Sequence, residues 1–174
     1  MSYRERVRKI LTKEEHRVLS PLSSPSRVQD YLDGLPINFE YAHETLMSPR
    51  LVMQKKTAHC FEGALFAALA LAYHGRLPYL MDFQTVQNDE DHVIALFEER
   101  GKWGAISKTN HAPLRYRDPI YKTPYELGMS YFHEYFLWDG KKSLKKFSKP
   151  FKAKTRTAGT LYEFPSANLT CGSP

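Results

Sequence analysis

The segment from Cys60 to Gly75 is the feature of the sequence that most restricts the fold. It reads CFEGALFAALALAYHG and is apolar nearly all round, which predicts a helix buried on most of its sides. Glycine and alanine recur at helical spacing from Cys60, so another element can approach that face closely. Gly75 is suited to end the helix, and either Thr57 or His59 to begin it. In both cases Cys60 lies in the first turn.

A strand pattern follows this helix. Residues 77–83, 92–97 and 102–107 are predicted strands, and the short turn at 98–101 makes the last two an antiparallel hairpin. If the hairpin loop has two or three residues, His92 lies opposite one of positions 107–109. The register therefore predicts that Ser107 or a near neighbour lies beside His92.

Shorter helices are predicted around this centre. An amphipathic, peripheral helix is expected over residues 4–16. Ser24 and Ser48 each precede a proline, which predicts helices that run from there to Gly34 and Gln54. Thr123 and Glu126 form the pattern of a capping box, so another helix is expected from there to about residue 135. Together these elements predict an α+β fold in one domain over 1–174, with N-terminal helices in 1–44, a core at about 45–120, and a C-terminal helix and basic tail in 121–174.

Composition and charge exclude several classes of protein. The 174 residues are 42% hydrophobic, which suits a globular chain, and two cysteines, Cys60 and Cys171, do not make a disulfide framework. The charged N-terminus lacks the apolar stretch of a signal peptide, and the longest apolar run, 64–73, is too short to cross a bilayer. We therefore expect a cytoplasmic protein without a membrane span.

The excess of 25 basic over 19 acidic residues is concentrated late in the chain, in 141–156. A solvated basic surface is the favoured interpretation, and nucleic acid is an unlikely partner because no RNA-binding or zinc-finger spacing is present. Nucleic-acid binding through this segment remains the alternative hypothesis. Its residues would be Lys141, Lys142, Lys145, Lys146, Lys149, Lys152, Lys154 and Arg156.

Cys60 and His92 are the candidates for chemistry. A thiol becomes a good nucleophile when a helix N-terminus and a histidine lower its pKa, and Cys60 meets the first condition. A third polar group usually orients such a histidine. A small core cysteine is the structural alternative. A metal pair of His59 and His92 is another, but no further ligand knuckle completes a tetrahedral set, so we expect no metal.

The run from Thr57 to Pro78, TAHCFEGALFAALALAYHGRLP, resembles the transglutaminase-like superfamily. In that family a cysteine opens an alanine-rich helix, a histidine later starts a strand, and a tryptophan leads a strand that ends in aspartate. Cys60, His92 and Trp103 match these positions, and DHVIALF with GKWGAIS looks like a bacterial branch of the superfamily. The resemblance covers roughly residues 45–120. It implies a transglutaminase-like, papain-like core in which the cysteine-bearing helix packs on an antiparallel sheet.

The resemblance also implies roles. Cys60 would be the nucleophile, His92 the base and later the acid, and Gln54 an oxyanion-hole donor six residues before the cysteine. The family's aspartate falls on Ser107, whose hydroxyl carries no charge and stabilises an imidazolium less than a carboxylate does. Asn110 is a possible third member instead, and Asp118 is a charged candidate off the motif.

The expected activity is a cysteine-dependent hydrolase or acyltransferase acting on amide, ester or thioester bonds of a peptide or small acyl substrate. No cofactor and no particular oligomeric state are implied. The alternative is a catalytically inactive relative that binds a peptide, ligand or partner in the old cleft, which the missing aspartate favours.

Overall fold

A computed structural model describes residues 2–39 and 45–153, and within them the chain has a mixed α+β architecture. The helices are α1 (Tyr3–Lys9), α2 (Lys13–Leu19), α3 (Pro25–Asp33), α4 (Pro49–Lys55), α5 (Cys60–Tyr73), a short 3-10 turn (Ala112–Leu114) and α6 (Pro124–Met129). The strands are β1 (Tyr79–Thr85), β2 (His92–Glu99), β3 (Lys102–Ile106), β4 (Arg117–Tyr121), β5 (Leu144–Phe147) and β6 (Phe151–Lys152). The α+β class predicted from the sequence is therefore confirmed.

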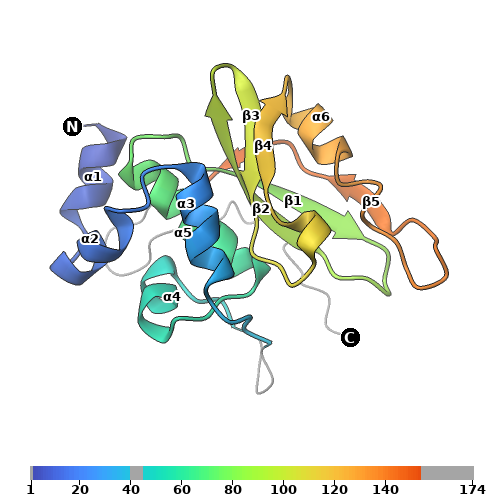
Figure 1. The fold of residues 1–174 in the computed structure, drawn as a ribbon, viewed down its shortest axis with the longest axis horizontal. Helices are drawn as coiled ribbons and strands as arrows, with labels where there is room; N and C mark the ends of the chain where they lie inside the picture. Colours follow the sequence, from blue (N-terminus) through green and yellow to red (C-terminus); the bar gives the residue numbers. More distant parts are fainter. Residues whose placement is uncertain (1, 40–44, 154–174) are drawn as a thin grey trace.

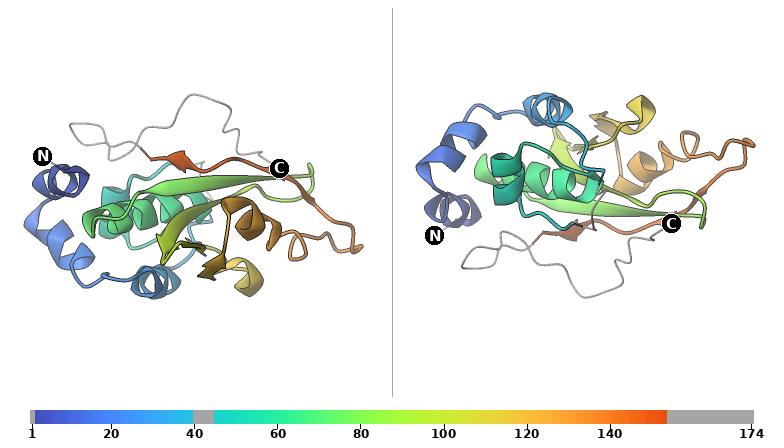
Figure 2. Two further views of the ribbon diagram at one scale, coloured as in Figure 1. Left: turned by 90° about the horizontal axis from the view of Figure 1, so that it is seen from above. Right: turned by 90° about the horizontal axis from the view of Figure 1, so that it is seen from below.

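The strands form one antiparallel sheet in the order β4-β3-β2-β1-β5, and β6 pairs with β1 beside β5. Helices α1 to α5 gather on one side of the sheet, whereas α6 lies on the other side with β3 and β4 (Figures 1 and 2). Successive side chains of the central strands point to opposite sides of the sheet. Leu80 and Ala95 pack with α5, whereas Met81 and Ile94 pack with the residues around α6.

Helix α5 is the centre of the larger core, and its predicted position is confirmed. Its residues from Glu62 to Tyr73 are all buried, with buried residues of α1, α3 and α4 in the same cluster. The predicted close approach occurs at Gly63, where an added Cβ would lie 2.2 Å from the Cβ of Lys108. Only glycine fits there, so the first turn of α5 is held directly against the chain that leaves β3.

The predicted hairpin of β2 and β3 is also confirmed. Ala95 pairs with Ile106 and Glu99 with Lys102, and a tight turn through Gly101 joins the strands. His92 is the first residue of β2, as the sequence predicts, and lies opposite Phe83 of β1. No helix among the described residues is long and apolar enough to cross a membrane.

Two predicted helices differ from the structure. The single helix expected over 4–16 is wrong, because Thr12 caps a new helix through a capping box with Glu15 and separates α1 from α2. The helix expected to reach about residue 135 ends at Met129. There the Ser130 hydroxyl donates to the Leu127 carbonyl at 2.6 Å, a side-chain bond that competes with continuation of the helix.

Candidate functional site

Cys60 is the first residue of α5, and its half-buried thiol has two histidine partners. His59 precedes it in the chain, and His92 comes from the start of β2. Burial would raise the pKa of the Cys60 thiol, but hydrogen bonds with His59 and His92, and their positive charge, lower this pKa to about 6. At neutral pH the thiolate is therefore the major form.

His92 is buried, and besides Cys60 it contacts Ser107, the residue that the hairpin register predicts beside it. Its Nε2 atom lies 2.6 Å from the Ser107 hydroxyl oxygen, so the predicted proximity of these two residues is confirmed. Because Nε2 is occupied by Ser107, Nδ1 is the ring nitrogen that remains for the thiol of Cys60. A proton taken up at Nδ1 leaves an N–H at Nε2 that donates to the serine oxygen.

Ser107 is itself held by a residue from the N-terminal helices. The side-chain amide of Gln29 on α3 accepts from the Ser107 N–H at 2.9 Å and donates to the Ser107 carbonyl at 2.8 Å. The same amide nitrogen donates to Asp33 at 2.8 Å, and Gln29 is only 1% exposed. This two-point contact fixes the backbone of Ser107 at the place where β3 ends, and thereby its hydroxyl.

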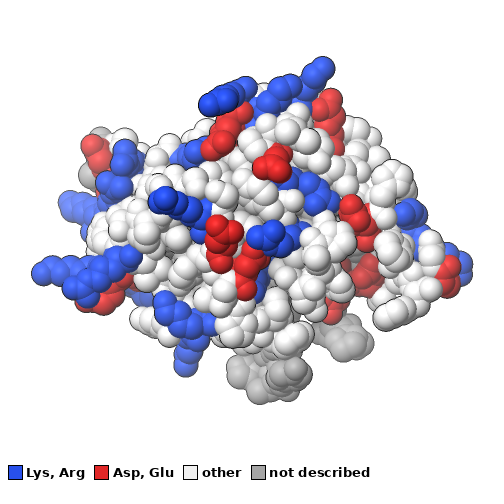
Figure 3. Space-filling view, viewed as in Figure 1, with Lys and Arg blue, Asp and Glu red and all other residues white. Residues whose placement is uncertain are grey.

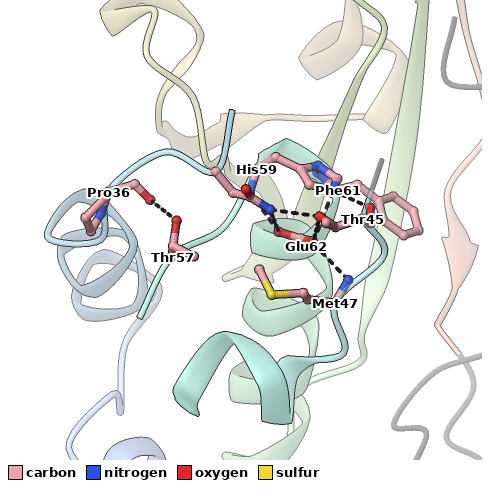
Figure 4. Close-up of polar contacts among 8 residues, drawn as sticks. Pro36, Thr45, Met47, Thr57, His59, Phe61 and Glu62 are labelled. Carbon is pink, nitrogen blue, oxygen red and sulfur yellow. Dashed lines mark hydrogen bonds and ion pairs between the residues drawn. The ribbon is translucent and has the colours of Figure 1, made fainter. Parts of the chain in front are cut away.

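The buried carboxylate of Glu62 lies beside the His59 ring (Figure 4). Glu62 has no exposed surface and accepts from Thr45 Oγ1 and the Met47 N–H, each at 2.8 Å, and from the His59 N–H at 3.0 Å. Burial would raise the pKa of Glu62, but these bonds and its contact with the His59 ring lower the pKa to about 2. Glu62 is therefore a carboxylate that closes the N-terminus of α5 and joins it to the segment at 45–47.

The His59 ring lies against this carboxylate, and its charge also acts on the thiol. Its Nε2 lies 3.4 Å from a Glu62 oxygen and 3.1 Å from the Thr45 carbonyl, while its Nδ1 accepts from the Phe61 N–H at 3.3 Å. Burial would lower the pKa of His59, but Cys60 and Glu62 raise it to about 10. A cationic ring has no lone pair at Nδ1, so protonation of His59 removes the long hydrogen bond from the Phe61 N–H. We favour the cation, because two anions adjoin the ring.

The structure does not bring the other predicted site residues into this cluster. Gln54 is exposed on α4, Asn110 is exposed in the loop after β3, and Asp118 is exposed on β4. None of the polar contacts found among the described residues connects these three to Cys60 or His92. Cys171 lies outside the described residues, as do Lys154 and Arg156 of the basic segment.

Sequence reasoning missed the roles of Gln29 and Glu62 and two further residues near the site. Asp82 on β1 is buried next to the strand position paired with His92; burial raises its pKa, and the His92 charge acts against that. Tyr135 is buried close enough to Cys60 for the cysteine to contribute to its raised pKa. The signal for Glu62 was present in its spacing from His59, whereas nothing local marks Gln29, 78 positions from its partner.

No group of three or more histidine, cysteine, aspartate or glutamate residues within 2–39 and 45–153 could hold a metal ion. On the face shown in Figure 3, basic and acidic side chains are interspersed. The described lysines of the basic segment are exposed on and around β5 and β6, at the edge of the sheet away from β4.

A comparison with protein-family models finds no match to this chain, and a comparison with curated proteins finds none either.

Proposed function

We propose that the protein is a cysteine-dependent hydrolase or acyltransferase with a transglutaminase-like, papain-like core. The observation that carries this proposal is the Cys60 thiol, which opens a buried helix and whose pKa is lowered by the neighbouring imidazoles of His59 and His92. The chain order of cysteine helix, histidine strand and following strand, with the helix packed on an antiparallel sheet, supports the same assignment.

The chemistry begins with the thiolate of Cys60, whose proton is held at Nδ1 of His92. The sulfur attacks the carbonyl carbon of an amide, ester or thioester, and the carbonyl π electrons move to the oxygen. Backbone N–H groups at the start of α5 stabilise that oxyanion. When the tetrahedral species collapses, the bond to the leaving group breaks, and His92 gives its proton to that group. Water or an amine then attacks the thioester carbon, and His92 accepts the proton of this second nucleophile. The C–S bond breaks, which releases the acyl product and returns the Cys60 thiolate.

Ser107 makes the partner of His92 in this site an uncharged one. When His92 is an imidazolium, the Ser107 hydroxyl accepts from its Nε2–H as the aspartate of the family does, but it supplies no charge. The carboxylate of the cluster, Glu62, instead pairs with the other histidine, His59. The uncharged partner of His92 favours a second candidate function, a catalytically inactive protein that binds a peptide or ligand beside Cys60.

The pH dependence of Cys60 alkylation by iodoacetamide tests the proposal. In a Cys171→Ser background we expect a midpoint near 6, well below the roughly 8.5 of a free thiol. His92→Ala should raise the midpoint because the thiolate loses one of its cationic neighbours. A matched change of His133, an exposed histidine next to Phe132, should leave the midpoint unchanged.

Two outcomes count against the proposal. A midpoint at or above 8.5 that does not respond to His92→Ala identifies Cys60 as an unreactive core residue. An activated thiolate that no acyl donor can acylate favours the binding function instead.

A further inference from the structure

Three buried hydroxyl groups have no hydrogen-bond partner among the described residues, namely those of Tyr131, Tyr135 and Ser143. A buried hydroxyl that loses its bonds to water and gains none costs about 1–3 kcal/mol. Such groups are rare in folded proteins, so each requires a reason. Tyr131 and Tyr135 lie on the same side of the sheet, in the cluster around Phe83, and are therefore suitable for comparison with each other.

Tyr135 lies beside the strand position of His92. Its ring stacks on Phe83 with 6.1 Å between centroids, and Phe83 pairs directly with His92 across β1 and β2. Its backbone carbonyl accepts from the Ser143 N–H, and the Ser143 carbonyl accepts from Val86 in the loop that leads to His92. Tyr135 is thus fixed to the end of the sheet at which Cys60 and His92 meet.

The charges that act on the two phenols also distinguish Tyr135 from Tyr131. Burial raises the pKa of Tyr135, and the charges of Tyr131, Cys60, Asp89 and Asp91 raise it further. The Tyr131 ring instead lies against Arg117, 4.1 Å from the guanidinium carbon, and Cys60 does not contribute to its pKa. The Tyr135 phenol remains protonated at neutral pH, so it can donate a hydrogen bond toward the thiol end of the site.

The proposed reaction at Cys60 needs a hydrogen-bond donor for the oxyanion. The tetrahedral intermediate at Cys60 carries a negative oxygen, and Gln54, the side-chain donor expected from the sequence, is exposed on α4 instead. Oxyanion holes often combine backbone N–H groups with a side-chain donor such as asparagine, glutamine or tyrosine. The Tyr135 hydroxyl has no hydrogen-bond partner among the described residues, so its proton is available to the oxygen of an incoming substrate.

We propose that the Tyr135 hydroxyl donates a hydrogen bond to the carbonyl oxygen of an acyl substrate attacked by Cys60. This inference rests on the proposed function and adds a side-chain donor to the oxyanion hole of that site. The phenol keeps its proton throughout. It binds the oxygen more strongly as the carbonyl becomes an oxyanion and releases it when the thioester forms.

Acylation and alkylation of the same thiol separate this role from a structural one. Acylation by p-nitrophenyl acetate passes through an oxyanion, whereas displacement of iodide from iodoacetamide does not. In the full chain with Cys171→Ser, Tyr135→Phe should slow acylation of Cys60 by about 100- to 1,000-fold, the usual effect of removing one oxyanion donor. Alkylation should stay within about twofold, since no developing oxyanion is involved. Tyr131→Phe, the matched control, should change neither rate.

Each other result overturns the inference. If Tyr135→Phe slows both reactions equally, the hydroxyl serves the thiol or the fold, and if it slows neither, it does not contact the oxygen. A Tyr135→Phe chain that melts far below Tyr131→Phe shows a structural partner for the hydroxyl. If Cys60→Ala in the same background releases p-nitrophenol as fast as the protein with Cys60 intact, the proposed function itself fails, and this inference fails with it.

Discussion

At the residue scale, the uncharged partner of the histidine is the feature that most distinguishes this site. A carboxylate beside His92 would stabilise the imidazolium by charge, whereas Ser107 offers only a lone pair in a short hydrogen bond. The pKa of the thiol is nevertheless about 6, because the His59 ring adds a second positive charge beside it. The carboxylate of Glu62 keeps that ring protonated. The charge that the motif lacks on one side of the cysteine is thus supplied on the other.

Ser107→Ala should raise the midpoint of Cys60 alkylation by about one pH unit, because the His92 imidazolium loses its acceptor. It should also lower the free energy of unfolding by about 1–3 kcal/mol, because a buried ring nitrogen is left unpaired. Ser143→Ala is the control, since this serine is equally buried and its hydroxyl has no partner among the described residues. Alkylation profiles and urea unfolding measure both effects. Equal profiles for Ser107→Ala and Ser143→Ala would contradict the assigned role.

At the element scale, Glu62 determines how α5 begins. Its carboxylate accepts from the His59 N–H, the N-cap of the helix, and ties the helix to the segment at 45–47. These bonds exist for the charged form, so protonation of Glu62 weakens both the cap and the connection. The N-terminus that carries Cys60 is therefore held by a group that titrates only in strong acid.

Glu62→Gln should remove an acid-dependent part of the stability. The folded-state pKa of about 2 lies below the ordinary value of 4.5, so Glu62 stabilises the fold fully above pH 4.5 and progressively less as pH falls toward 2. That difference corresponds to about 3 kcal/mol. Urea unfolding at pH 2.5 to 7 should show a shallower decline in the variant. Glu126→Gln, an exposed acid at the start of α6, is the matched control. A decline as steep as in the unmodified protein would refute the linkage.

At the scale of the whole molecule, local patterns in the sequence predicted the parts of the site but not the means by which they are held. The apolar run gave α5, and the hairpin register brought Ser107 to His92, because both depend on neighbours in the chain. Gln29 acts across 78 positions, and no periodicity or spacing reports such a contact. Tyr135 was missed for a similar reason, since only the folded sheet brings it near Cys60.

Gln29 makes the N-terminal helices part of the site. Gln29→Leu keeps most of the side chain's volume but leaves the buried N–H and carbonyl of Ser107 without their partner, which should cost about 2–4 kcal/mol of unfolding free energy. The alkylation midpoint of Cys60 should rise as it does in Ser107→Ala, because the hydroxyl loses its fixed position. Asp33→Asn leaves both bonds between Gln29 and Ser107 in place and alters the third contact of the Gln29 amide and the Asp33 ion pair with Arg115, so it should have a much smaller effect on the midpoint.

A double-mutant cycle distinguishes this coupling from general loss of stability. If Gln29 acts on the thiol through Ser107, the combined Gln29→Leu and Ser107→Ala chain should show nearly the same alkylation midpoint as Ser107→Ala alone. Midpoint shifts that simply add would mean that Gln29 acts on Cys60 by another route, and α3 would then be a support for the core without a specific part in the chemistry.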